Sequence, residues 1–203
     1  MRLVHAFLVI VDISGYTAFI HERQTSLLHA EQIITALLEA MIDRTEFPLT
    51  LNKLEGDAAF FWAESGADRG AAMRDALGQV RALFAAFDAR LAQVAAERAN
   101  CTCEACASIA GLRIKAFVHC GEVAVKQVRQ FEELAGEDVI LVHRLMKNHL
   151  AEREYVLLSE AAASACALPE GAGRAHAEEF EGLGELRLTV LPREALARLW
   201  EPL

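Results

Sequence analysis

Apolar residues form an unbroken run near the N-terminus and recur at helical spacing further along the chain. Residues 3–13 are almost continuously apolar and rich in β-branched side chains, a pattern typical of a strand buried on both faces. Ser14-Gly15 ends this run. Apolar residues then repeat every three to four positions over 27–42, which predicts a helix that ends before Phe47-Pro48, because proline disfavours helix in the residue before it.

The remaining pattern predicts hairpins that alternate with helices. We expect strands over 49–54, 57–63, 112–119, 123–128, 155–158 and 185–191, and helices over 73–94, 137–150, 159–166 and the C-terminus. Two of the expected hairpins turn at Glu55-Gly56 and at Cys120-Gly121. This order predicts one α+β domain over residues 1–203, with a mostly antiparallel, ferredoxin-like sheet that is covered by helices.

Composition narrows the class of protein. The chain has 203 residues, 54% of them hydrophobic, which suits one domain with a full core. No apolar run approaches the roughly 18 residues of a membrane span, and the N-terminal strand lacks the cleavage site of a secretory signal, so we expect a cytoplasmic protein without a membrane partner. The net charge of −9 argues against a nucleic-acid partner, although a small phosphorylated ligand with a bound metal ion is compatible with it.

Asp12 is the first candidate for chemistry. It stands at the end of a strand that we expect to be buried, where a carboxylate needs a partner such as a divalent cation. The Ser14-Gly15-Tyr16-Thr17 turn that follows opens a helix, and backbone N–H groups at a helix N-terminus can hold phosphate. The alternative is that Asp12 only caps that helix.

Asp57 is the second candidate. It follows Gly56 at the tip of a predicted hairpin, with Lys53 four residues earlier, and alone it reads as an ordinary polar turn. In a ferredoxin-like layer the first strand and this hairpin can lie side by side. Asp12 and Asp57 could then share one or two Mg²⁺ ions, which would hold a triphosphate.

A cysteine cluster forms the third candidate. Cys101, Cys103 and Cys106 fall within six residues, and thiolates at such spacing can bind Zn²⁺. Cys120 or His119 from the next predicted hairpin could supply a fourth ligand. The alternative is a loop with reduced thiols; if zinc binds, it would brace the loop and perform no chemistry.

Five segments in chain order give these candidates a context. They are Val11–Thr17, Lys53–Asp57, Lys115–Val123, Gly136–Leu145 and Gly182–Thr189. They resemble, in the same order, the Asp-Ile-x-Gly-Phe-Thr, Lys-x-x-Gly-Asp, Gly-Ile-His-x-Gly-x-Val, Gly-x-x-Val-Asn-x-Ala-x-Arg-Met and Gly-Lys-Gly-Glu-Met-x-Thr-Tyr segments of class III adenylyl and guanylyl cyclases. The chain also resembles a smaller bacterial group of cyclase-domain relatives without an assigned function.

The resemblance assigns roles to individual residues. It implies that Asp12 and Asp57 bind Mg²⁺ or Mn²⁺ and that Ile13 contributes its backbone carbonyl. It implies that Lys53 reads the base of a nucleoside triphosphate, with Glu133, or Glu132 in another register, accepting from an adenine amino group. Arg144 would come from the second subunit of a homodimer and stabilise charge on the α-phosphate.

Two residues that the family uses are missing. Ile140 stands where an asparagine would orient the ribose, and Leu183 or Glu181 stands where a lysine would meet phosphate, with Arg187 badly spaced to replace it. We therefore expect a cyclase-like domain that binds a metal–nucleoside triphosphate, ATP by preference, with weak or lost cyclisation to the 3′,5′-monophosphate. The alternatives are an inactive regulatory or protein-interaction module and a zinc-braced scaffold.

Overall fold

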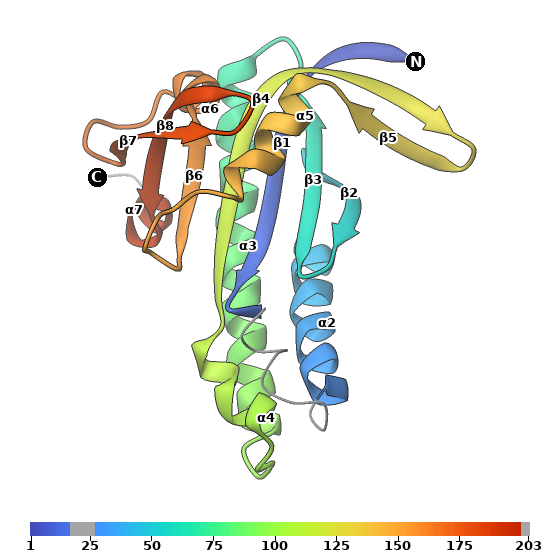
Figure 1. The fold of residues 1–203 in the computed structure, drawn as a ribbon, viewed down its shortest axis with the longest axis vertical. Coiled ribbons are helices and arrows are strands. Elements are labelled where there is room, and N and C mark those ends of the chain that lie inside the picture. The colour runs from blue at the N-terminus through green and yellow to red at the C-terminus, as the bar shows by residue number, and fades with distance from the viewer. Residues whose placement is uncertain (17–26, 200–203) are drawn as a thin grey trace.

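The computed structural model describes residues 1–16 and 27–199, which form one sheet with helices on both faces (Figure 1). The strands are β1 (Arg2–Ser14), β2 (Thr50–Glu55), β3 (Ala58–Glu64), β4 (Arg113–Val128), β5 (Phe131–Ala135), β6 (Tyr155–Ser159), β7 (Arg174–Phe180) and β8 (Gly184–Pro192). The helices are α2 (Leu27–Arg44), α3 (Arg69–Glu97), α4 (Glu104–Ser108), α5 (Glu137–Leu145), α6 (Glu160–Cys166) and α7 (Arg193–Arg198), with a 3₁₀ turn η2 (Ile109–Gly111).

The sheet is mostly antiparallel. Its strands follow the order β2-β3-β1-β4-β6-β8-β7, and β5 pairs with β4 outside this path. Every pairing is antiparallel except that between β4 and β6. The predicted α+β class, with a mostly antiparallel sheet covered by helices, is therefore confirmed.

Strand β1 is central and is buried on both faces, as its continuous apolar run predicts. The odd-numbered residues Phe7, Val9 and Val11 pack into the core beneath α2 and α3. The even-numbered residues Leu8 and Ile10 pack into a second core beneath α5. By this alternation Asp12 lies on the α5 face of the sheet.

Strand β4 is one continuous strand, which corrects the hairpin expected around Cys120-Gly121. It pairs with β1 from Ser14↔Arg113 to Arg2↔Val125 without a break. A side chain at position 121 would begin about where the Asp138 carboxylate of α5 lies, 2.1 Å from it. Gly121 is thus needed for close helix packing rather than for a turn.

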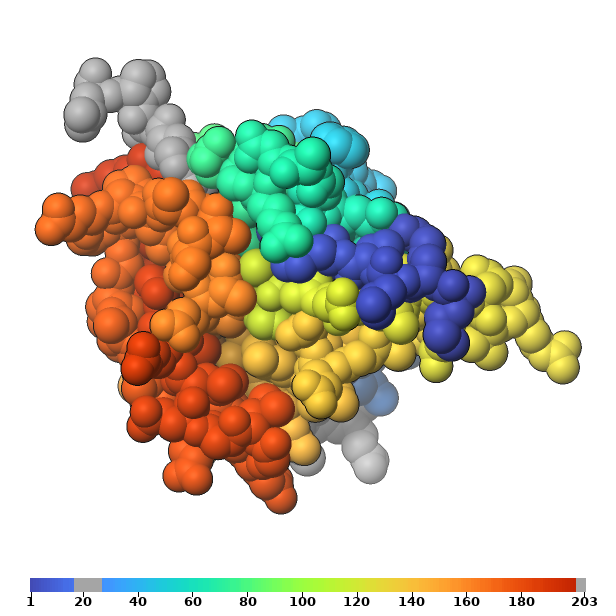
Figure 2. All heavy atoms as spheres, turned by 90° about the horizontal axis from the view of Figure 1, so that it is seen from above, coloured from blue at the N-terminus to red at the C-terminus, as the bar shows by residue number. Residues whose placement is uncertain are grey.

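The real hairpin is formed by β4 and β5, which project from the body of the molecule as an arm (Figure 2). The sequence pattern missed both β5 and β7, whose residues alternate too irregularly between apolar and polar. It also extended helix α5 to residue 150, whereas the helix ends at Leu145. Among the described residues, no helix combines the length and apolarity that crossing a membrane requires.

Candidate functional site

Asp12 and Asp57 lie at the same end of neighbouring strands. Asp12 is opposite Ala58 in the β1–β3 register, and Asp57 immediately precedes Ala58 in the tight turn between β2 and β3. The backbone N–H of Ile13 donates to the carbonyl oxygen of Asp57, with 3.3 Å between the two atoms. The structure thus joins the strand end and the hairpin tip that the sequence singles out.

The surroundings of the Asp57 carboxyl group disfavour its ionised form. Burial, with a further contribution from the charge of Asp12, raises the pKa of Asp57 to about 6. Tyr16 is close enough that the charge of Asp57 contributes to the raised pKa of its phenol, after burial and a hydrogen bond to Glu31. A cation that binds beside Asp57 would relieve the repulsion that its carboxylate experiences from Asp12.

Two cations that the sequence analysis did not single out lie at this turn. The Lys115 ammonium is 3.2 Å from an Asp12 carboxylate oxygen. The Arg153 guanidinium lies against Gly15 and donates to the carbonyl of Gly111. Gly15 has a positive φ of 98°, and a side chain there would meet Arg153 at 2.5 Å. The cross-strand pairing of Asp12 with Lys115 could have been found only with the β1–β4 register in hand.

The turn also holds a polar atom without a partner. The Ser14 hydroxyl oxygen is buried, and within residues 1–16 and 27–199 no group hydrogen-bonds to it. Together with two carboxylates, this oxygen-rich set fits a hard divalent cation such as Mg²⁺ or Mn²⁺. Thr17, the last residue of the expected phosphate turn, lies outside the described residues.

The expected base-reading residues meet each other. The Lys53 ammonium is 2.9 Å from a Glu133 carboxylate oxygen, and this hydrogen bond holds the pKa of Glu133 below its ordinary value. The neighbouring Glu132 contacts β2 through its backbone carbonyl, which accepts a hydrogen bond from the Asn52 side chain. Of the two registers, the structure therefore places Glu133 beside Lys53.

Helix α5 carries the residues expected to act on a partner's nucleotide. Arg144 and Ile140 line the same hollow of about 330 Å³ on its outer face. Ile140 is 55% exposed, an unusual position for an isoleucine. Arg144 forms a long ion pair with Glu181, at 3.9 Å. Leu183 instead packs against the core beneath α5.

A partly buried chain of hydrogen bonds fixes α5 on the sheet. The Asp138 carboxylate contacts the His119 ring at 2.8 Å, and the other ring nitrogen contacts the Ser159 hydroxyl at 2.7 Å. Asp138 also accepts from the backbone N–H of Glu122. Burial lowers the pKa of His119 despite the nearby carboxylate. The Ser159 hydroxyl also caps α6 by accepting from the backbone N–H of Ala162. These hydrogen bonds therefore have a structural role: they hold α5 and α6 on the sheet.

The cysteine cluster gains a different fourth member from the one expected. Cys101, Cys103 and Cys106 lie together, and the ring of His29 from α2 completes the group. Cys120 does not belong to it, because it is a buried residue in the middle of β4, opposite Phe7. His119 is committed to Asp138 and Ser159.

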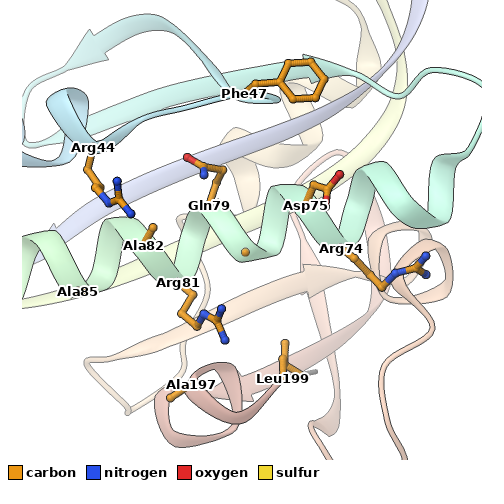
Figure 3. Close-up of a pocket in the computed structure, with 11 residues that line it drawn as sticks. Arg44, Phe47, Arg74, Asp75, Gln79, Arg81, Ala82, Ala85, Ala197 and Leu199 are labelled. Carbon is orange, nitrogen blue, oxygen red and sulfur yellow. The ribbon is translucent and has the colours of Figure 1, made fainter. Parts of the chain in front are cut away.

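A wide cavity lies in another part of the molecule. It measures about 920 Å³ and lies over α3, between α2 and the end of α7. Figure 3 shows Arg44, Arg74 and Arg81 beside it. None of the expected site residues lines it.

Comparison with known proteins gives a family and a fold. Residues 34–155 match the family model described as "Protein of unknown function (DUF2652)". The chain is 39% identical over 152 residues to the uncharacterized protein Rv2561/Rv2562 of Mycobacterium tuberculosis, covering 73% of this chain and 68% of that protein.

Solved structures of nucleotidyl cyclases share the fold. The guanylyl cyclase Cya2 superposes with a TM-score of 0.71 at 14% identity, over 94% of this chain and 92% of that one. A class III adenylyl cyclase-like ATP-binding protein from Pseudomonas aeruginosa gives 0.63 at 15% identity, over 80% of this chain and 35% of that one. At these identities the likeness establishes the class III cyclase fold and nothing finer, and the resemblance seen in the sequence is confirmed.

Proposed function

Because the chain belongs to the family of proteins of unknown function DUF2652 and has a class III cyclase fold, we propose that it is a cyclase-like domain that binds a divalent-metal nucleoside triphosphate. The observation that carries the proposal is that Asp12 and Asp57 lie at the same end of neighbouring strands, close enough for the charge of Asp12 to raise the pKa of Asp57. Their carboxylates would hold Mg²⁺ or Mn²⁺, which would neutralise triphosphate charge when bound.

The cations at the turn support a phosphate ligand. Lys115 neutralises Asp12 in the metal-free protein, and its flexible side chain could turn to a phosphate oxygen once a metal ion takes over that role. Arg153 lies against Gly15 in the turn that follows Asp12. These two residues would partly replace the lysine that the family places near Leu183 or Glu181.

The nucleotide base would be read on the other half of the site. Lys53 and Glu133 supply a donor and an acceptor side by side, which suits an adenine edge, and we therefore favour ATP. In the family's arrangement Arg144 belongs to a second subunit, so the proposal includes a homodimer. The ATP-binding activity named for the Pseudomonas aeruginosa protein is consistent with a cyclase fold that binds ATP.

Turnover is expected to be weak or absent. Ile140 offers no hydrogen bond to a ribose, and the charge of Arg144 faces Glu181. Loss of one positioned transition-state group costs about 10²–10³ in rate. The hollow beside Ile140 instead favours a second candidate, an inactive module that contacts a partner protein.

The test is binding of Mn²⁺ and each of the four nucleoside triphosphates, measured by calorimetry, with products identified by mass spectrometry. We expect Mn²⁺-dependent binding of ATP that Asp57→Asn abolishes. Asp75→Asn, an exposed carboxylate on α3, serves as the matched control and should change nothing. Absence of binding to every triphosphate would overturn the proposal in favour of the module. Cyclisation near a typical enzymatic rate of about 10 s⁻¹ would contradict weak turnover.

A further inference from the structure

The three loop cysteines and a histidine from a distant helix meet at the end of the molecule where α4 lies (Figure 1). We call this group the thiol–imidazole cluster; its members are His29, Cys101, Cys103 and Cys106. His29 lies in the first turn of α2, 72 residues before Cys101 in the chain. Its ligand atom and the three sulfur atoms all lie within 4.8 Å of one another.

The distances within the cluster match a tetrahedral metal site. The His29 Nδ1 atom lies 3.4 Å from the sulfur of Cys103, 3.6 Å from that of Cys101 and 3.8 Å from that of Cys106. Zinc bonds of about 2.05 Å to nitrogen and 2.3 Å to sulfur, at a tetrahedral angle, require a nitrogen–sulfur separation of about 3.6 Å. The three separations observed bracket this value.

The local backbone supports thiolate ligands. Cys103 and Cys106 stand in a Cys-x-x-Cys spacing, with Cys103 as the N-cap of α4. The backbone N–H of Cys106 donates to the Cys103 sulfur at 3.4 Å. Such N–H donors near a helix N-terminus stabilise a thiolate over a thiol. All four members are half-buried, so a metal ion could reach them and yet be partly shielded from water.

We propose that the thiol–imidazole cluster binds one Zn²⁺ ion in a closed, tetrahedral site. Three sulfur ligands and one imidazole nitrogen are the donor set that zinc prefers, and four protein ligands leave no open position for substrate. Binding releases the three thiol protons to solvent and leaves the cysteines as thiolates, without any change of oxidation state.

The site joins two segments that the sheet does not connect. It links the first turn of α2 to the loop between α3 and β4, close to a hydrogen bond from Arg98 to the Gln32 side chain. His29 lies in the first turn of α2, so zinc would hold the start of this helix against the cysteine loop. The role is structural, and it does not depend on nucleotide binding at Asp12 and Asp57.

The first test uses the unmodified protein. We expect native mass spectrometry of protein purified without chelator to show one zinc ion per chain, and a thiol reagent to release it. Cobalt substitution should give the sulfur-to-metal absorption band of tetrahedral thiolate coordination. Protein from zinc-supplemented cells with no bound metal would overturn the proposal. So would a disulfide between two cluster cysteines, seen as a denatured mass two hydrogens lower and located by peptide mass spectrometry.

Variants identify the ligands. His29→Gln and Cys103→Ser should each lower the zinc affinity by at least about tenfold. Cys120→Ser is the matched control, since it removes a buried thiol outside the cluster and should retain full zinc content. If Cys120→Ser lost zinc and His29→Gln kept it, the assignment would be wrong. His29 is partly exposed, so its substitution tests the site without disturbing the core.

Discussion

At the scale of single residues, the Asp12 turn holds two nearby carboxylates, of which Lys115 neutralises only one. Asp57 ionises reluctantly because it is half-buried and lies near Asp12, whereas Lys115 offsets the charge of Asp12 directly. A site of this kind is less stable when empty than when a cation occupies it. Its charge balance can therefore be tested separately from any nucleotide chemistry.

Asp57→Asn should stabilise the metal-free protein near neutral pH. The folded-state pKa of about 6 is above the ordinary value of 3.8, so ionisation of Asp57 begins to destabilise the fold above about pH 3.8 and has its full cost above about pH 6. As pH falls from about 6 toward 3.8, the folded state takes up this proton first and the cost disappears. We expect a gain on the order of 1 kcal/mol at about pH 7.5, since solvent screens a half-exposed carboxylate, and almost none at about pH 4. Urea unfolding in metal-depleted buffer measures it; equal gains at both pH values would contradict the shift.

Lys115→Met should separate metal binding from phosphate binding. Its ammonium competes with any cation for Asp12, so its removal should tighten Mn²⁺ binding by about tenfold. The same change should weaken binding of Mn²⁺·ATP if Lys115 also contacts phosphate. Titration calorimetry with Mn²⁺ alone and then with ATP gives both values, and Arg81→Met, an exposed cation on α3 away from the proposed site, is the control. Weaker Mn²⁺ binding in Lys115→Met would show that the lysine does not compete for the site.

At the scale of elements, the contact between β4 and α5 sets the position of Ile140 and Arg144. Gly121→Ala should destabilise the protein by about 1–3 kcal/mol, because the new methyl group would overlap the Asp138 carboxylate. Gly78→Ala in α3 is the control: nothing lies within 4 Å, and alanine favours a helix, so stability should rise slightly. Thermal unfolding compares the two variants. An unchanged midpoint for Gly121→Ala would mean that α5 is free to shift on the sheet.

The same contact shows where sequence reasoning ends. Long, strongly patterned elements such as β1 and α3 could be predicted, because burial on both faces or on one helical face leaves a clear periodicity. Gly121 could not be interpreted, since a glycine needed for close packing looks the same in sequence as one needed for a turn. His29 could not be predicted as a member of the cysteine cluster either, because it joins the cysteines only through the packing of α2 against α4.

At the scale of the whole molecule, the residues expected to bind nucleotide form two groups on one chain. Asp12, Asp57 and the neighbouring cations lie at the β1 end and the β2–β3 turn, whereas Ile140 and Arg144 line a hollow on the outer face of α5. In a two-fold dimer, the first group of one chain can face the second group of its partner. Each dimer would then contain two shared sites, and each chain would contribute half of either site.

Mixing two defective chains tests whether the site is shared. Asp57→Asn should disable the metal half, and Arg144→Ala should disable the other half with little structural cost, because Arg144 is exposed and its ion pair with Glu181 is long. Neither variant alone should bind Mn²⁺·ATP well. After unfolding and joint refolding in zinc-containing buffer, half of the dimers should be mixed, each with one intact site, so about a quarter of the wild-type binding capacity should return. Calorimetric stoichiometry measures this fraction. If wild-type protein binds ATP but the mixture recovers none of that capacity, both halves of the site must come from the same chain.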